Sequence, residues 1–177
     1  MSSGPLFDLK YPIGLYSPPN EITHDHIALW IDQIATLPER VRKAVESITE
    51  EQLNTQYRPN GWTVRQVIHH IPDSHVNSYI RFKWALTEDN PTIKAYNEAD
   101  WAELFDTKDN SIDVSLDFLE IVHKKLVNVL KSMNADQLKR TFTHPENGNN
   151  ISLDWNIGMY AWHGEHHLAH IDSIVNK

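Results

Sequence analysis

The sequence contains no cysteine among its 177 residues. This absence excludes disulfides and thiolate ligands, so a bound transition metal would have to use His, Asp, Glu or water. Lysine and arginine are also few, 16 against 24 aspartates and glutamates, and they form no basic block. Because nucleic-acid affinity depends on clustered cations that neutralise phosphates, we expect no nucleic-acid partner.

Long hydrophobic runs are missing as well. No segment approaches the roughly 18 apolar residues that a membrane-spanning helix needs, and the first ten residues lack the basic and apolar regions of a signal peptide. We therefore expect a cytoplasmic protein that does not bind a membrane. With 40% hydrophobic and 23% charged residues, the chain fits one globular domain over residues 1–177.

Apolar residues recur at three- and four-residue steps in four segments, which is the period of a helix with one buried face. The segments run from Thr23 to Ile48, from Thr63 to Leu86, from Val114 to Met133 and from Ser152 to about Val175. Pro38 predicts a kink or a break in the first of them. The sequence thus predicts an all-α fold, a four-helix bundle.

The segments between these helices differ in character. Residues 1–22 hold four prolines among apolar side chains, which predicts an extended N-terminal arm that packs along the bundle. Thr63 followed three residues later by Gln66 predicts a capping box at the start of the second helix. We expect a short helical piece near residues 98–105, a linker over 106–113 and an irregular loop over 143–150.

Eleven histidines are a high count for this length, and most of them lie in the second and fourth helices. His163 and His167 are four residues apart, so both rings project from one helical face and can bind one cation. His166 and His170 have the same spacing on a face turned by about 100°, and both pairs cannot enter one small site. We favour the pair at 163 and 167, which falls along the bulky apolar stripe of its helix.

A third ligand has to come from a facing helix. In the doublet of the second helix, His70 borders the buried stripe that contains Val67 and Ile71, whereas His69 is turned farther away. The sequence therefore predicts a divalent metal site that consists of His70, His163 and His167.

Five stretches carry a family resemblance: Tyr11–Gly14, Gly61–His70, Asp73–His75, Asn77–Phe82 and Trp162–His170. Through them the chain resembles the DinB/YfiT-like superfamily, and closely its YfiT branch of metal-dependent hydrolases, from about residue 9 to the C-terminus. The resemblance implies a four-helix bundle, a cytoplasmic homodimer and one zinc or nickel ion held by three histidines. Matched by motif, these ligands are His70, His163 and His167.

Two residues depart from the family pattern. Pro72 stands where a small helix-forming residue is expected, which could alter the helix beside His70. Glu165 stands where the YfiT relative carries a histidine, which indicates that this position is not a required ligand.

Three neutral imidazoles leave a tetrahedral ion one open position, which suggests catalysis rather than a structural role. The first hypothesis is a metal-dependent hydrolase of a small-molecule substrate. The second, suggested by related branches of the superfamily, is transfer of a low-molecular-weight thiol such as bacillithiol; the third is a non-catalytic metal-binding protein. Asp73, Asn77 and Arg81 are candidates to support a ligand or to line the pocket, and no residue is assigned as catalytic.

Overall fold

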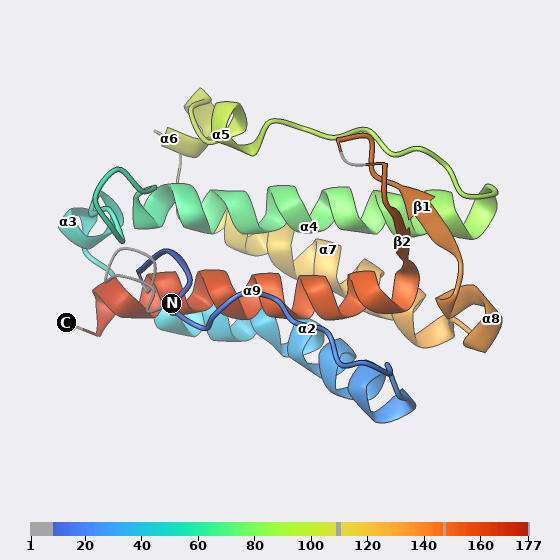
Figure 1. Ribbon diagram of the computed structural model, residues 1–177. Coiled ribbons are helices and arrows are strands. Elements are labelled where there is room, and N and C mark those ends of the chain that lie inside the picture. The colour runs from blue at the N-terminus through green and yellow to red at the C-terminus, as the bar shows by residue number, and fades with distance from the viewer. Residues whose placement is uncertain (1–8, 109–110, 147, 177) are drawn as a thin grey trace, which may run out of the picture.

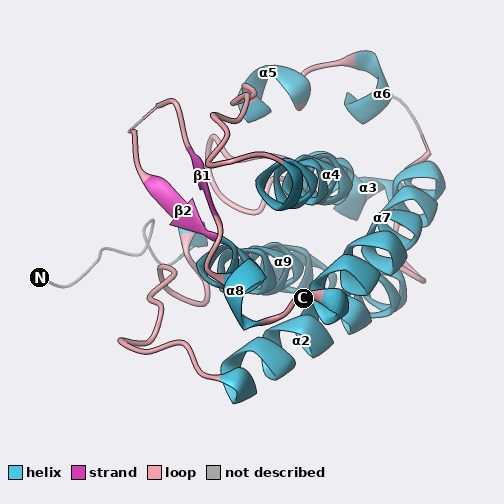
Figure 2. Cartoon of the chain, turned by 90° about the vertical axis from the view of Figure 1, so that its right-hand side faces the viewer, coloured by secondary structure: helices cyan, strands magenta, loops and turns pink. Residues whose placement is uncertain are grey.

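The computed structural model describes residues 9–108, 111–146 and 148–176, and four long helices dominate this part of the chain (Figure 1). They are α2 His24–Ala44, α4 Val64–Thr87, α7 Ile112–Ser132 and α9 Leu153–Val175. The end view in Figure 2 shows that α2 and α4 each lie beside both α7 and α9. The predicted all-α, four-helix bundle is confirmed.

Helices α4 and α7 run in the same direction, and this sets the shape of the longest connection. Two parallel neighbours cannot be joined by a tight turn, so the chain returns over the outside of α4 (Figure 1). The return contains α5 Glu98–Trp101 and α6 Phe105–Lys108, where a single helical piece and a linker were expected. Residues 109 and 110 of the expected linker lie outside the described part.

Shorter elements complete the fold. Helix α3 spans Glu50–Leu53, α8 spans Ala135–Leu138, and β1 Thr141–Thr143 pairs antiparallel with β2 Asn150–Ser152. The irregular loop expected over residues 143–150 is therefore wrong at both ends, because these ends are paired strand residues. Phe142 is fully buried between two threonines, and a three-residue alternation is too short to identify a strand from sequence.

The helix boundaries follow local capping and tolerate internal prolines. The Thr63 side chain accepts from the Gln66 amide while the Gln66 side chain accepts from the Thr63 amide, so the predicted capping box is confirmed. Helix α2 continues unbroken through Pro38, where a kink or a break was expected, and ends at Ala44 rather than at Ile48. The carbonyl of Ile34 lies four residues before that proline and accepts a hydrogen bond from His123 on α7 instead.

Two apolar clusters form the core, one toward each end of the bundle. One includes Leu37, Val41, Ile68, Ile71 and Ile171, and the other includes Ile34, Phe82, Leu126, Leu153 and Ile157. Buried polar residues lie between the two clusters along α4, α7 and α9, among them His75, Ser78, His123 and His167. Val114, predicted to lie on the apolar side of its helix, is 59% exposed, because it is turned by about 200° from buried Leu116.

The described part of the N-terminal arm packs along α9, as predicted. The Trp162 indole donates to the carbonyl of Gly14 at 3.2 Å, and the Tyr16 hydroxyl donates to the carbonyl of Trp155 at 3.3 Å. A Cβ atom at Gly158 would clash with Tyr16 and with Trp30 of α2, so this glycine permits the close approach. Within the described ranges, the structure has no helix whose length and apolar character would suit a bilayer span.

Candidate metal centre

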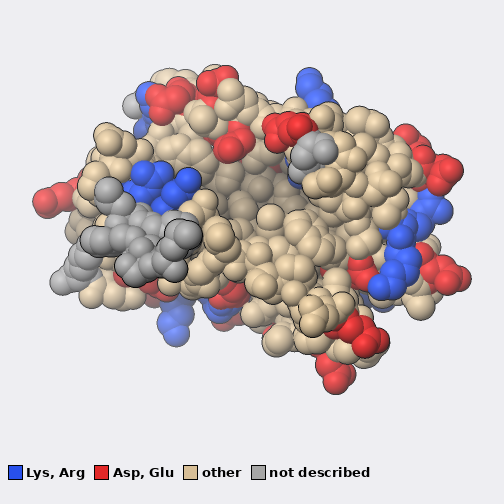
Figure 3. Space-filling model, viewed as in Figure 1, with Lys and Arg blue, Asp and Glu red and all other residues tan. Residues whose placement is uncertain are grey.

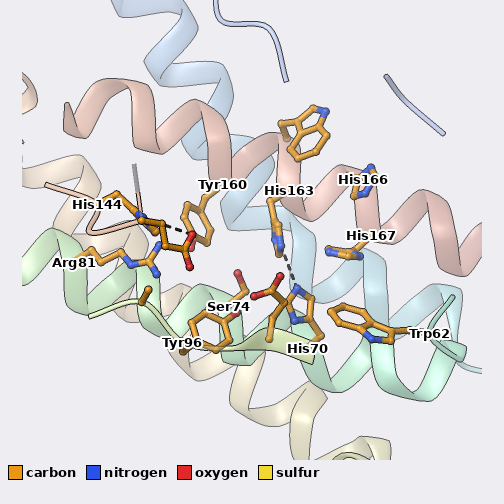
Figure 4. Close-up of a pocket in the computed structure, with 14 residues that line it drawn as sticks. Trp62, His70, Ser74, Arg81, Tyr96, His144, Tyr160, His163, His166 and His167 are labelled. Atoms are coloured by element: carbon orange, nitrogen blue, oxygen red, sulfur yellow. Dashed lines mark hydrogen bonds and ion pairs between the residues drawn. The ribbon is translucent and has the colours of Figure 1, made fainter. Parts of the chain in front are cut away.

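Two antiparallel helices place three histidine rings against one another. Helix α4 contributes His70, about one turn after its capping box, and α9 contributes His163 and His167 from adjacent turns of one face (Figure 4). Pro72 does not interrupt α4, which runs unbroken to Thr87. Pro72 therefore leaves His70 on the face of α4 that the helical period predicts.

The spacing of the three rings suits a transition metal. Each offers a nitrogen within 4.8 Å of the other two, and Nε2 of His70 lies 3.3 Å from Nε2 of His163. A tetrahedral ion with bonds of about 2.0–2.1 Å holds its ligand nitrogens about 3.3–3.4 Å apart. The measured separation is thus the one that coordination requires, and the donor set fits a divalent ion.

Burial keeps these ligands neutral. Desolvation, with a contribution from His166, lowers the pKa of His70 to about 4. Desolvation lowers the pKa of His163 and of His167 well below the usual value, and the neighbouring imidazoles add to the effect. A neutral imidazole has the free lone pair that a metal needs, so these rings need lose no proton to bind an ion near neutral pH.

A second group of three histidines overlaps the first. His166, His167 and His170 also offer nitrogens within 4.8 Å of one another. However, both nitrogens of His170 have partners, Nε2 with the carbonyl of Lys10 at 3.2 Å and Nδ1 with Nδ1 of His167 at 3.4 Å. His166 stacks on Trp162 and projects away from His70 in Figure 4. The first group is therefore the better candidate.

The three histidines form one wall of a cavity of about 360 Å³. Figure 3 shows the hollow in the face that Figure 1 presents. Trp62 and Ser74 line it beside the histidines, Arg81 and Tyr160 line it farther along, and the long connection and the hairpin add Tyr96, Glu98, His144 and Glu146. The three candidate ligands thus lie on helices, while much of the opposite wall of the cavity lies on connecting segments.

The three predicted support residues have different positions. Arg81 lines the cavity and donates to the Tyr160 hydroxyl at 3.4 Å, and its Nε has no hydrogen-bond partner within the described ranges. Asp73 and Asn77 are not among the residues that line the cavity. The Asn77 amide donates to the carbonyl of Asp73 at 2.8 Å, and burial together with Asp106 of α6 raises the pKa of Asp73 to about 6.

Glu165, the other departure from the family pattern, faces α2. Its carboxylate accepts from Arg40 at 2.8 Å, away from the three histidines. This position agrees with the expectation that it is not a ligand.

Sequence reasoning missed His75, which contacts the site, and His123, which contacts His75. His75 was given no role, yet its Nε2 lies 3.1 Å from Nδ1 of His163, and its Nδ1 lies 2.9 Å from Nε2 of His123. His123 is 1% exposed. A signal was present, because His123 follows the apolar Leu119 by four residues and Leu116 by seven, which places it on the buried face of its helix.

A sequence profile of the DinB superfamily matches residues 33–171. The chain belongs to the DinB superfamily. A protein of Bacillus cereus (strain 03BB102), named "Putative metal-dependent hydrolase", is 54% identical over 96% of this chain and 97% of its own length. A protein of Bacillus thuringiensis subsp. konkukian (strain 97-27) with a name of the same kind has the same identity and coverage.

A solved structure is also similar. YfiT from Bacillus subtilis is 43% identical, with a TM-score of 0.93 over 96% of this chain and 97% of that one. It is described as "a probable metal-dependent hydrolase with an unusual four-helix bundle topology". These relatives are named or described as metal-dependent hydrolases, and this DinB chain has a histidine group able to hold a metal.

We expect the metal-free protein to lose stability as the pH falls from 6.5 toward 4. Seven buried or largely buried histidines have folded-state pKa values below the usual 6.5, among them His123 at about 4, so the unfolded chain binds more protons over this range. Each unit of pKa difference corresponds to about 1.4 kcal/mol per group. Asp73 and Asp172, whose pKa values are raised by burial, act in the opposite direction, but they are two groups against seven.

Urea unfolding at a series of pH values measures this dependence. The stability should be fully present above pH 6.5 and should decline below it. A free energy of unfolding that stays constant or rises between pH 6.5 and 4.5 would contradict the assignment of neutral buried histidines.

Proposed function

We propose that this protein is a metal-dependent hydrolase of a small-molecule substrate, with one divalent ion held by His70, His163 and His167. Zinc and nickel are the candidate ions, because both accept imidazole nitrogen. Zinc is the first choice of the two. The observation that carries the proposal is the 3.3 Å separation of two Nε2 atoms in a group of three histidines, two buried and one half-buried, that opens on a cavity. The names of the relatives from Bacillus cereus and Bacillus thuringiensis support the same reaction class.

The chain supplies ligands, orientation and partial exclusion of water. His70, His163 and His167 would hold the ion, and a bound divalent ion would supply Lewis-acid activation of water or of a substrate oxygen. Arg81 donates to the Tyr160 oxygen, so the hydroxyl hydrogen of Tyr160 remains available for a substrate oxygen. Trp62, whose ring centroid lies 4.6 Å from that of His70, covers the site on one side.

Thiol transfer is the second candidate function, and Arg81 is the observation that favours it. Arg81 lines the cavity at the end opposite Trp62, and its buried Nε has no hydrogen-bond partner within the described ranges. Such a group suits an anionic substituent on a second substrate, which a low-molecular-weight thiol can carry. A non-catalytic metal-binding protein is the remaining alternative, and turnover of any substrate would exclude it as the whole function.

We expect the wild-type chain, purified without a histidine tag and loaded with zinc or nickel, to contain one ion per chain by elemental analysis. His163→Ala should abolish stable binding, because two imidazoles do not complete the site. His166→Ala is the matched control on the same helix and should retain the ion. Loss in His166→Ala alone would indicate that the overlapping group at 166, 167 and 170 binds the metal, and equal loss in both variants would contradict the choice of the first group.

The dependence of turnover on thiol distinguishes the two reactions. Hydrolysis needs only water, so the loaded protein should cleave members of an ester and amide panel at a rate that added bacillithiol does not change. The metal-free protein and the loaded His163→Ala variant are the controls. Turnover of electrophiles that strictly requires the thiol would replace hydrolysis with thiol transfer.

The homodimer implied by the family resemblance stays a prediction. Helix α7 exposes Val114, Phe118 and Ile121, which would form an apolar surface for a second copy of the chain. Sedimentation equilibrium of the wild type should give twice the chain mass. A Phe118→Lys variant should shift the mass toward the monomer, and an unchanged mass would place the contact elsewhere.

A further inference from the structure

A chain of hydrogen bonds starts at His123, a buried histidine outside the candidate metal group. His123 on α7 is 1% exposed, and its Nδ1 lies 2.5 Å from the backbone carbonyl oxygen of Ile34 on α2. A carbonyl only accepts hydrogen bonds, so Nδ1 of His123 must carry the hydrogen. The carbonyl is available because Pro38, four residues later, has no amide to offer it.

The direction of the next two hydrogen bonds follows from this anchor. In a neutral imidazole one nitrogen donates and the other accepts, so Nε2 of His123 accepts from Nδ1 of His75 at 2.9 Å. Nε2 of His75 then accepts from Nδ1 of His163 at 3.1 Å. His75 is fully buried and His123 is 1% exposed, and burial disfavours the charged form of an imidazole, so both rings are neutral.

His163 is therefore fixed with its hydrogen on Nδ1 and its lone pair on Nε2. That Nε2 is the atom that lies 3.3 Å from Nε2 of His70. The chain of hydrogen bonds thus leaves the lone pair of His163 on Nε2, which is also the nitrogen that its short separation from His70 assigns to the proposed ion.

A second and shorter chain acts on the other ligand of α9. Nε2 of His170 lies 3.2 Å from the carbonyl of Lys10 in the N-terminal arm, so it carries the hydrogen. Nδ1 of His170 is then an acceptor, and its partner at 3.4 Å is Nδ1 of His167. The lone pair of His167 is therefore on Nε2, as is the lone pair of His163.

We propose that His75, His123 and His170 are positioning residues that hold both α9 ligands as the Nδ1–H tautomer, each chain of hydrogen bonds ending on a backbone carbonyl. The inference rests on the proposed metal site and deepens it. Metal-binding histidines commonly donate to a carboxylate, a carbonyl or water, and a carboxylate makes the ligand more basic. Here the two α9 ligands donate to neutral imidazoles, which fixes each ring with less donation of charge and would leave a bound ion a stronger Lewis acid.

The tautomers can be read directly in the metal-free wild type. Long-range nitrogen–proton correlation spectra of the imidazole rings, assigned by single substitutions, should show His75, His123, His163 and His167 protonated at Nδ1 and His170 protonated at Nε2. His163 or His167 protonated mainly at Nε2 before the metal is added would overturn the inference. This measurement needs no variant to bind metal.

Metal affinity, measured by competition with a chelator, is the second readout. His75→Leu removes the acceptor at similar volume and should weaken zinc binding roughly 10- to 100-fold, and His170→Leu should do the same. His75→Gln places an amide oxygen near the lost Nε2 and should recover most of the affinity, which a purely structural role would not predict. His69→Leu is the matched control, since His69 is a buried histidine of α4 that bonds to Ser115 at 2.7 Å and should keep wild-type affinity.

The outcomes separate this inference from the proposed function. Wild-type affinity in folded His75→Leu and His170→Leu would overturn the positioning role and leave the metal site standing. Failure of the wild type to bind any divalent ion would overturn the proposed function, while the tautomer spectrum would still decide the inference. Equal weakening in His69→Leu and His75→Leu would count as general destabilisation and would also overturn it.

Discussion

Each buried imidazole has one N–H donor and one lone pair, and inside a helix bundle both need a partner. This constraint organises the centre of the molecule. His123 reaches the carbonyl of Ile34, and that carbonyl is free because Pro38 cannot bond to it. The proline that would weaken an isolated helix is therefore part of the hydrogen bonding of the core. The same constraint passes through His75 to His163, so the proposed metal site and the bundle interior share one network.

The polar layer also explains why the core is divided. Apolar clusters at the two ends of the bundle supply the burial that holds the helices together, and the histidine layer between them adds little hydrophobic stabilisation. A layer of this kind is tolerable only when its members satisfy one another, because an unpaired buried polar group costs about 1–3 kcal/mol. The histidines thus specify how the helices align, while the apolar ends supply the stability.

The order of the helices determines what surrounds the proposed ion. Because α4 and α7 are parallel neighbours, the chain crosses back over α4, and this crossing brings Tyr96 and Glu98 to the cavity. The hairpin before α9 adds His144. The candidate ligands lie on rigid helices, whereas much of the cavity wall lies on connecting segments. This arrangement allows the wall to change between relatives while the proposed metal site stays the same. Differences in substrate among DinB proteins are therefore expected in these connections.

The sequence by itself determined the features that depend on the helical period. It identified four long helices, the capping box at Thr63, and the shared face of His163 and His167, because positions on one helix are related by a known rotation. It also favoured His70 over His69, and the structure brings His70 to the other two, although their role as ligands is still a prediction. Short elements such as the β1–β2 hairpin lay below the length at which periodicity is informative.

Only the tertiary structure decided which faces meet. Contacts between helices depend on their order and direction, which no local pattern contains, and so the link from His163 through His75 to His123 was invisible in the sequence. The spacing of Asp73, Asn77 and Arg81 on α4 made all three candidates to line the pocket. It could not reveal that, of these three, only Arg81 lines the cavity. Val114 was assigned to the apolar side of its helix, but it is turned by about 200° from Leu116 and lies away from the packed face of α7. Rotation within a helix is fixed by local hydrogen bonds, but the partner of each helical face is fixed by the packing of the whole chain.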